Sequence, residues 1–377
     1  MTYLPPFAME RWQSHHEHYV EHNLSDSGVH PLSLGEVLQL TQQSLAEIRL
    51  GYTQSDGTPG LKSAIAALYD GATEANVVVT TGGAEANMVA VWELVRPGDR
   101  VVIVQPAYGQ IGGLVRGLGG EVVGLPLRES LGWQPEPGAA ADLISADTRL
   151  VVVTNPNNPT GAILNQASRD ELLAAAARAG AWVLADEVYT GAELAREPTP
   201  SLWGDYERVV ATNSLSKAYG VPGLRIGWLI APEDLKEKCW ARKDYTTIAP
   251  SALSDSIAAA VLQPEVRAAL LSRTRGILVQ NLALVSEWVA ALGSAFTFRP
   301  PDAGAICYLR YAFESNSTEL AEQLRMNQSL LIVPGDHFGM DGYLRLGFGL
   351  PEAELDLALV RLGEGVRLAI EAGAVSI

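Results

Sequence analysis

Short apolar runs, each bounded by turn-forming residues, recur between residues 77 and 230 and constrain the fold more than any other feature. Runs of this length with few polar positions are typical of strands buried on both faces. The runs are Val77–Thr80, Val101–Val104, Leu150–Thr154, Trp182–Ala185, Arg208–Thr212 and Ile226–Ile230. We therefore expect these segments to lie inside one sheet.

Helical patterns separate several of these runs. They cover Ala84–Val95, Gly109–Leu118 and Ser168–Arg178, and in the last of them Ser168 is the expected N-cap ahead of Glu171. Alternation of strand and helix produces parallel strands with helices on both faces. The pattern predicts an α/β fold whose large domain is built on a mainly parallel, doubly wound sheet.

The length of the chain, 377 residues, exceeds that of one ordinary domain. After about residue 249 the sequence becomes strongly helical, and weaker strand signals come after the helical part. These signals are Ile306–Tyr311, Leu330–Val333 and Leu344–Phe348. We expect a large domain of residues 46–275 and a smaller α+β domain built from both chain ends, residues 1–45 and 276–377.

Charge and cysteine content disfavour several classes of protein. A formal net charge of −16 argues against binding to nucleic-acid phosphates, because proteins that do so concentrate Lys and Arg. Two cysteines, Cys239 and Cys307, are too few for a disulfide framework and fit a reducing compartment. The sequence has neither a secretory leader pattern nor an apolar run of about 18 residues. We expect a cytoplasmic protein that binds neither nucleic acid nor a membrane.

The run Asn213–Trp228 carries the strongest chemical signal. Lys217 is framed by Ser214 and Ser216, and a turn rich in glycine and proline leads to Arg225. A lysine in such a setting suits a Schiff base with pyridoxal phosphate beside a phosphate site.

A second signal is the segment Thr80–Asn87, where a strand ends at two glycines and a helix begins. Free backbone N–H groups and a positive helix end could hold a phosphate there, although a purely structural turn is the alternative. The segment lacks the G-x-G-x-x-G spacing of dinucleotide sites, so a nicotinamide cofactor is disfavoured.

Asp186 and Tyr189 come directly after the run Trp182–Ala185, at the edge where open α/β sheets bind ligands. A buried aspartate could keep a pyridine nitrogen protonated and make the ring an electron sink, or Asp186 could simply cap a helix. Tyr189 could reach the phenolic oxygen of such a ring or pack in the core.

Other candidate residues have both a functional and a structural interpretation. The turn Asn155–Gly161 could aim one amide at a cofactor oxygen or be a turn alone. Tyr108 could stack on a planar ring or lie in the core. Arg345 lies in an apolar strand and needs an anionic partner, either a substrate carboxylate or a neighbouring acid. The cluster His15–His18 lacks histidines four residues apart, so we expect no metal site.

These features together resemble the fold type I, class I and II pyridoxal-phosphate-dependent aminotransferases. Their order carries the resemblance: the Gly-Gly turn, Tyr108, the Asn-Pro-x-Gly turn, Asp186 with Tyr189, and Lys217 followed by Arg225. The likeness covers essentially the whole chain. It implies pyridoxal phosphate as cofactor, an L-amino acid as substrate and a 2-oxo acid as acceptor.

The resemblance implies a role for each candidate around the cofactor ring. Lys217 would form the Schiff base, and Asp186 would pair with the pyridine nitrogen. Asn158 and Tyr189 would hold the ring hydroxyl oxygen, and Tyr108 would stack on the ring.

The same resemblance implies contacts at the phosphate and at the substrate. The phosphate would be held by the backbone of Gly83, Ala84 and Glu85, with Ser214, Ser216 or Arg225. Arg345, with Asn158, would bind the substrate carboxylate. Tyr52 would reach the phosphate of the neighbouring subunit, which implies a homodimer with active sites at the interface.

A narrower resemblance points to the capreomycidine-synthase branch of the family, which cyclises hydroxylated arginine. Its segments here are Glu10–Trp12, Ser25–His30, Arg242–Ile248 and Val333–Phe338. Glu10, Glu17 and Asp26 would supply counter-charges for a guanidinium, and Ser27 and Gly28 would also lie at the substrate. Tyr189 and the Asn157–Gly161 turn are instead ordinary aminotransferase residues. Transamination is therefore the first expectation and cyclisation the alternative.

Overall fold

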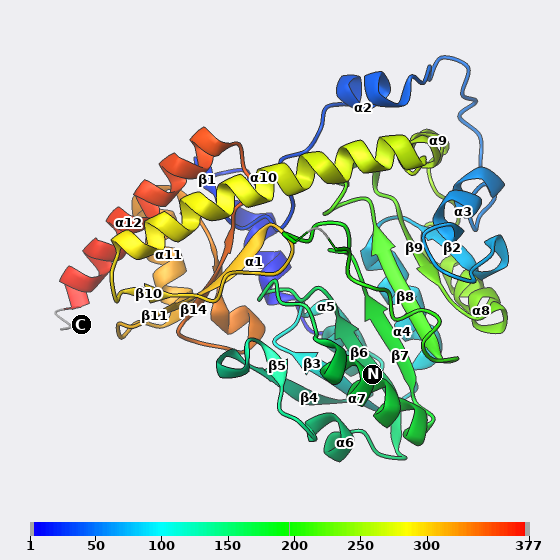
Figure 1. The fold of residues 1–377 in the computed structure, drawn as a ribbon, viewed down its shortest axis with the longest axis horizontal. Helices are drawn as coiled ribbons and strands as arrows, with labels where there is room; N and C mark the ends of the chain where they lie inside the picture. Colours follow the sequence, from blue (N-terminus) through cyan, green and yellow to red (C-terminus); the bar gives the residue numbers. More distant parts are fainter. Residues whose placement is uncertain (1–3, 196, 374–377) are drawn as a thin grey trace.

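The computed structural model describes residues 4–195 and 197–373. Its largest element is an eight-stranded sheet with strand order β2-β9-β8-β7-β6-β3-β4-β5 (Figure 1). The strands are β2 (Val77–Thr80), β3 (Arg100–Gln105), β4 (Glu121–Arg128), β5 (Gln134–Pro135), β6 (Thr148–Thr154), β7 (Trp182–Asp186), β8 (Val209–Ser214) and β9 (Gly227–Ile230). Every predicted apolar run is a strand of this sheet, so the predicted doubly wound sheet is confirmed.

Two strands of the sheet run against the others. β9 pairs antiparallel with β2 and β8, and β5 pairs antiparallel with β4. Residues 215–226 join β8 to β9 with only one short 3-10 helix, Pro222–Leu224. Because this link contains no α-helix that could cross the face of the sheet, the chain returns in the opposite direction. The link also keeps Lys217 at the edge of the sheet.

Helices cover both faces of the sheet. α4 (Gly83–Leu94), α5 (Gln110–Gly117) and α8 (Glu233–Lys243) pack on one face, while α6 (Ala139–Leu143) and α7 (Gln166–Ala179) pack on the other. Alternate strand residues enter the two cores, as Val101 and Val102 do in β3. This double burial explains why the strands read as continuous apolar runs.

The start of α7 corrects one prediction. Asn165, not Ser168, is the N-cap, and its side chain accepts a hydrogen bond from the Ser168 N–H at 2.9 Å. The helix therefore begins three residues earlier than expected, because the side-chain carbonyl of Asn165 accepts from an N–H group of the first turn. Glu171 instead accepts hydrogen bonds from the backbone N–H groups of Gly138 and Ala140, at the start of α6.

A second group of elements lies at the left of Figure 1. An antiparallel sheet with order β10-β11-β14-β13 is joined there by the paired strands β1 and β12. These strands are β1 (His22–Asn23), β10 (Phe296–Thr297), β11 (Ile306–Tyr311), β12 (Leu330–Leu331), β13 (Val333–Pro334) and β14 (Tyr343–Gly347). The α-helices not yet named, which belong to both parts of the molecule, are α1 (Ala8–His16), α2 (Leu34–Thr41), α3 (Pro59–Ala66), α9 (Ala252–Val261), α10 (Pro264–Ala291), α11 (Ser317–Gln328) and α12 (Glu352–Gly373).

The amino-terminal residues contact the carboxyl-terminal part of the chain. β1 pairs with β12, and Trp12 Nε1 donates a hydrogen bond to the Ile332 carbonyl at 2.9 Å. α10 is one continuous helix across the predicted domain boundary at residue 275, so both lobes pack on it (Figure 1). The domain boundaries stay a prediction. In the described part of the chain, none of the helices has the length and apolarity that a membrane crossing requires.

Candidate active site

A cavity of about 280 Å³ lies where the carboxyl ends of β6, β7 and β8 meet the first turn of α4 and the helix α1. Most of the predicted site residues line it, namely Glu10, Ser27, Gly83, Ala84, Tyr108, Asn158, Asp186, Tyr189, Ser214, Ser216, Lys217 and Arg225. Four others, Gly28, Tyr52, Glu85 and Arg345, are not among the lining residues.

Asp186 ends β7 and is only 6% exposed. Its Oδ2 accepts a hydrogen bond from Asn87 Nδ2 at 2.9 Å, and its Oδ1 accepts one from the Val188 N–H at 3.2 Å. Burial raises the pKa of Asp186 by more than these hydrogen bonds lower it. A cationic N–H group in the cavity would offset the cost of burying this carboxylate.

Asn87 is a site residue that the sequence analysis did not single out. Thr212 Oγ1 donates to Asn87 Oδ1 at 2.7 Å, which leaves the Asn87 N–H group to face Asp186. Asn87 lies four residues after Gly83 on α4, and therefore on the same face of that helix. That spacing was the available signal.

The first turn of α4 forms a concave, electropositive site. The N-cap is Gly82, with φ 81° and no side chain to cap the free N–H groups. Arg225 lies directly over it, because a Cβ on Gly82 would fall 2.3 Å from Arg225 Nη2. A Cβ on Gly83 would fall 3.5 Å from the Cβ of Ser214. A helix N-terminus with a guanidinium and a hydroxyl beside it suits a phosphate.

The side chain of Glu85 is directed elsewhere. Its Oε2 accepts a hydrogen bond from the Thr81 N–H at 2.6 Å, and its Oε1 accepts one from Thr247 Oγ1 at 2.8 Å. The carboxylate thus fastens α4 to the loop after α8. The backbone N–H of Glu85 remains at the start of α4. This N–H is the group that the family resemblance implies as a phosphate ligand.

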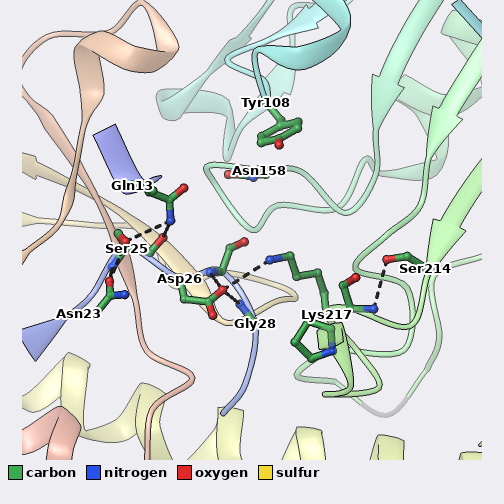
Figure 2. A network of polar contacts seen from close by, with 12 residues as sticks. Gln13, Asn23, Ser25, Asp26, Gly28, Tyr108, Asn158, Ser214 and Lys217 are labelled. Carbon is green, nitrogen blue, oxygen red and sulfur yellow. Dashed lines mark hydrogen bonds and ion pairs between the residues drawn. The ribbon is translucent and has the colours of Figure 1, made fainter. Parts of the chain in front are cut away.

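Lys217 points across the cavity toward Asp26 (Figure 2), with 3.5 Å between Lys217 Nζ and Asp26 Oδ1. The same oxygen accepts hydrogen bonds from the N–H groups of Ser27 and Gly28. Burial raises the pKa of Asp26, but the Lys217 charge and these N–H groups outweigh it, so the pKa lies below its ordinary value. Gly28 borders the lysine stem, since a Cβ there would lie 3.5 Å from Lys217 Cδ.

Two tyrosines border the cavity. Tyr108 donates its hydroxyl proton to Glu10 Oε1 at 2.6 Å, and its ring meets the edge of Phe7 with 4.8 Å between centroids. Burial, followed by the Glu10 carboxylate, raises the pKa of Tyr108 well above its ordinary value. Tyr189 is 2% exposed, and its ring packs against Gly304.

Arg345 lies behind Asn158 and is 1% exposed. Its Nη1 donates to Asn158 Oδ1 at 3.1 Å, and its Nη2 donates to the carbonyl of Ser25. Burial lowers its pKa, and Nε has no hydrogen-bond partner in residues 4–195 and 197–373. Over the same residues no carboxylate forms an ion pair with Arg345. A neighbouring acid, one of the two partners expected for Arg345, is therefore not found. The guanidinium keeps capacity for an anionic ligand.

Tyr52 lies outside the cavity. It belongs to the extended segment after α2, and its side chain is 93% exposed. One chain therefore does not bring Tyr52 to the other predicted site residues. The histidines His15, His16 and His18 join no group of metal-ligating side chains in the described residues.

The cavity has two contrasting walls. We define the cofactor wall as Gly83, Ala84, Asp186, Ser214 and Lys217, which lie at or just after the ends of strands of the large sheet. The amino-terminal wall comprises Glu10, Gln13, Glu17, Asp26 and Ser27, from α1 and the segment after β1. Gln13, which the sequence analysis did not select, donates to the Ser25 carbonyl at 2.8 Å and so joins the two parts of this wall (Figure 2).

The fold and this site define a pyridoxal-phosphate enzyme. The family model of aminotransferase class I and II matches residues 23–362, so the chain belongs to that family. It is a pyridoxal-phosphate-dependent aminotransferase, and amino acids and 2-oxo acids are the substrates of its family.

Individual relatives carry two kinds of activity. The chain is 34% identical to capreomycidine synthase of Streptomyces vinaceus over 96% of its own length and 94% of that protein. A pyridoxal-phosphate-dependent aminotransferase from Streptococcus suis superposes with a TM-score of 0.91 at 30% identity, covering 97% of this chain and 98% of the other. The pyridoxal-phosphate-dependent cyclase OrfR superposes with a TM-score of 0.89 at 29% identity over the same shares.

The residues present fit the cofactor. A buried carboxylate with a raised pKa suits a protonated ring nitrogen, and the start of α4 borders the cavity beside Arg225, where a phosphate could bind. Lys217 lines the same cavity as these two places. When bound, pyridoxal phosphate supplies a carbonyl that condenses with amines and a ring that accepts electrons from the substrate Cα.

Proposed function

We propose that the enzyme transaminates an L-amino acid whose side chain is cationic, with a 2-oxo acid as acceptor. The observation that carries this proposal is the amino-terminal wall, where Glu10, Glu17 and Asp26 border the same cavity as Lys217. Three carboxylates there favour a guanidinium or ammonium group and disfavour an acidic side chain.

We assign the proton transfers to the cofactor wall. Lys217 holds the cofactor and, once released from it, moves the proton at the substrate Cα. Asp186 keeps a proton on the ring nitrogen, and Asn87 keeps Asp186 in place. Asn158 and Tyr189 would hold the ring oxygen of the bound cofactor, and Tyr108 would stack on its ring.

We assign binding of the two anionic groups to opposite ends of the cavity. The backbone of Gly83, Ala84 and Glu85 would hold the phosphate, with Ser214, Ser216 or Arg225 beside it. Asn158, which lines the cavity, and Arg345 behind it would orient the substrate carboxylate. This role is supported by Arg345 Nε, which has no hydrogen-bond partner among the described residues. Anchoring at both ends fixes which Cα bond faces Lys217.

We further propose a homodimer in which Tyr52 reaches the partner's phosphate. Leu50, Tyr52 and Tyr245 are 80%, 93% and 77% exposed, and large exposed apolar side chains are typical of a surface that a partner covers. Sedimentation should give a dimer, and Tyr52→Ala should weaken cofactor binding. A cytoplasmic location is supported by the two buried, unpaired cysteines Cys239 and Cys307.

Cyclisation of a hydroxylated arginine is the second candidate reaction. The identity to capreomycidine synthase favours it, and the acidic wall suits that substrate as well. The two reactions share the removal of the Cα proton and differ only in the later steps.

Mass spectrometry of the products distinguishes the two reactions. Purified enzyme is incubated with arginine, ornithine, lysine and hydroxylated arginine, each with and without 2-oxoglutarate. Transamination predicts an oxo acid that forms in more than one turnover only when the acceptor is present. A cyclic product that keeps its amine and forms without an acceptor would overturn transamination in favour of the cyclase.

A further inference from the structure

A second cavity, of about 560 Å³, borders Tyr108 and is not lined by Lys217. Tyr108 lines both cavities, and its hydroxyl is fixed on Glu10 in the first. The walls of the second cavity come from the end of β3, the start of α5, the end of β4 and the 3-10 helix Gly335–Phe338. The volume lies within the range of small-molecule sites.

The charge of this second cavity is opposite to that of the chain as a whole. Its positive charge comes from the guanidinium groups of Arg116 and Arg128, whereas burial lowers the pKa of His337, the third basic residue of the lining. None of the described aspartates and glutamates lines this cavity. The chain carries a formal net charge of −16. A basic cavity on an acidic protein concentrates anions locally.

The basic groups are available to a ligand. Arg116 forms no ion pair with the described residues, and its Nη1 would lie 3.3 Å from a Cβ on Gly112, so the guanidinium lies along the cavity wall. Arg128 has one half-exposed partner, Glu136, at 3.3 Å. His337 Nδ1 is buried and has no hydrogen-bond partner in the described ranges.

The remaining lining is apolar, with Pro106, Pro126, Leu127, Phe338 and Met340. Guanidinium groups bind carboxylates through two parallel hydrogen bonds, and an apolar lining buries the body of an organic anion. We propose that the second cavity binds a small organic carboxylate with an apolar body. This site is independent of which reaction occurs at Lys217.

Calorimetric titration of the holoenzyme tests the site with a matched pair of probes. Hydrocinnamate has the carboxylate and an apolar body, and hydrocinnamamide has the same body without the charge. Wild-type enzyme should bind the acid at least about tenfold more tightly than the amide. The double variant Arg116→Gln/Arg128→Gln should bring this ratio close to one, while Arg361→Gln, which removes an exposed arginine on α12, should leave it unchanged.

Two outcomes would overturn the proposal: equal binding of acid and amide by the wild type, or a ratio that survives the double variant. Repeating the titration with Arg345→Gln, after checking that the cofactor absorbance is retained, separates two sources of the ligand. If Arg345→Gln keeps the ratio, the carboxylate is an independent ligand of the second cavity. If Arg345→Gln and the double variant both lose the preference for the acid, the ligand is a reactant that occupies the catalytic cavity and reaches past Tyr108 into the second cavity. Loss in Arg345→Gln alone would assign the anion to the catalytic cavity and contradict the proposal.

Discussion

Asp186 on the cofactor wall and Glu17 on the amino-terminal wall of the catalytic cavity differ in how firmly their side chains are held. On the cofactor wall, Asp186 is buried and is fixed through Asn87 to Thr212 by hydrogen bonds of 2.9 and 2.7 Å. On the amino-terminal wall, the Glu17 carboxylate lies 3.5 Å from the exposed ring of its neighbour His18, and among the described residues it accepts no hydrogen bond from a buried group. The cofactor wall suits the reaction steps that every substrate shares, because its side chains are preorganised. The amino-terminal wall suits a choice of substrate by charge, and its residues come from α1 and the segment after β1, outside the large sheet.

The largest effect should come from removing Lys217. We expect Lys217→Ala to lower kcat by roughly 10⁴-fold, the upper end of what a positioned general base contributes. Borohydride reduction and peptide mapping of the wild type should place the cofactor on the Lys217 peptide. Lys238→Ala, an exposed lysine of α8, is the matched control and should be fully active. A reducible cofactor adduct that persists in Lys217→Ala would contradict the assignment.

Asp186→Asn should have the next largest effect. The variant keeps the shape of the side chain but not its charge, so we expect cofactor to bind and kcat to fall by about 10- to 100-fold. Asp142→Asn, at an exposed position of α6, controls for the change of charge. Near-normal turnover with bound cofactor would exclude the proposed role in protonating the ring.

Asn87→Ala tests whether the cofactor wall depends on its supporting contact. Loss of the donor to Asp186 and of the acceptor for Thr212 should lower kcat by about tenfold and the free energy of unfolding by about 1–3 kcal/mol. Thermal unfolding and kcat at saturating cofactor are measured together. A lower melting temperature with unchanged kcat would make Asn87 a packing residue only.

The smallest effect should come from the amino-terminal wall. Glu17 is partly exposed, so we expect Glu17→Gln to lower the preference for arginine over its neutral isostere citrulline by about two- to threefold, with kcat for citrulline unchanged. Glu21→Gln, at an exposed position beyond α1, should leave the preference unaltered. A change of kcat for both arginine and citrulline would show that Glu17 affects the chemical step, and it would contradict a role in substrate choice.

The sequence allowed the cofactor wall to be predicted almost completely, because each of its residues lies next to a buried strand whose apolar run is visible. Asn87 was missed because its spacing from Gly83 indicates only a shared helix face, and its role depends on Thr212, which is distant in the chain. The pairing of Lys217 with Asp26 joins residues 191 positions apart. No local pattern encodes such a contact, and the position of Arg345 behind Asn158 was hidden for the same reason.

The charge preference of the amino-terminal wall is the central claim, and single-turnover spectroscopy measures it most directly. Arginine and citrulline are each mixed with the wild-type holoenzyme, and the change in cofactor absorbance is recorded as a function of concentration. Both candidate reactions begin with this step, so the result does not depend on which of them the enzyme completes. We predict an apparent affinity at least about tenfold higher for arginine. Equal or tighter binding of citrulline would contradict the account.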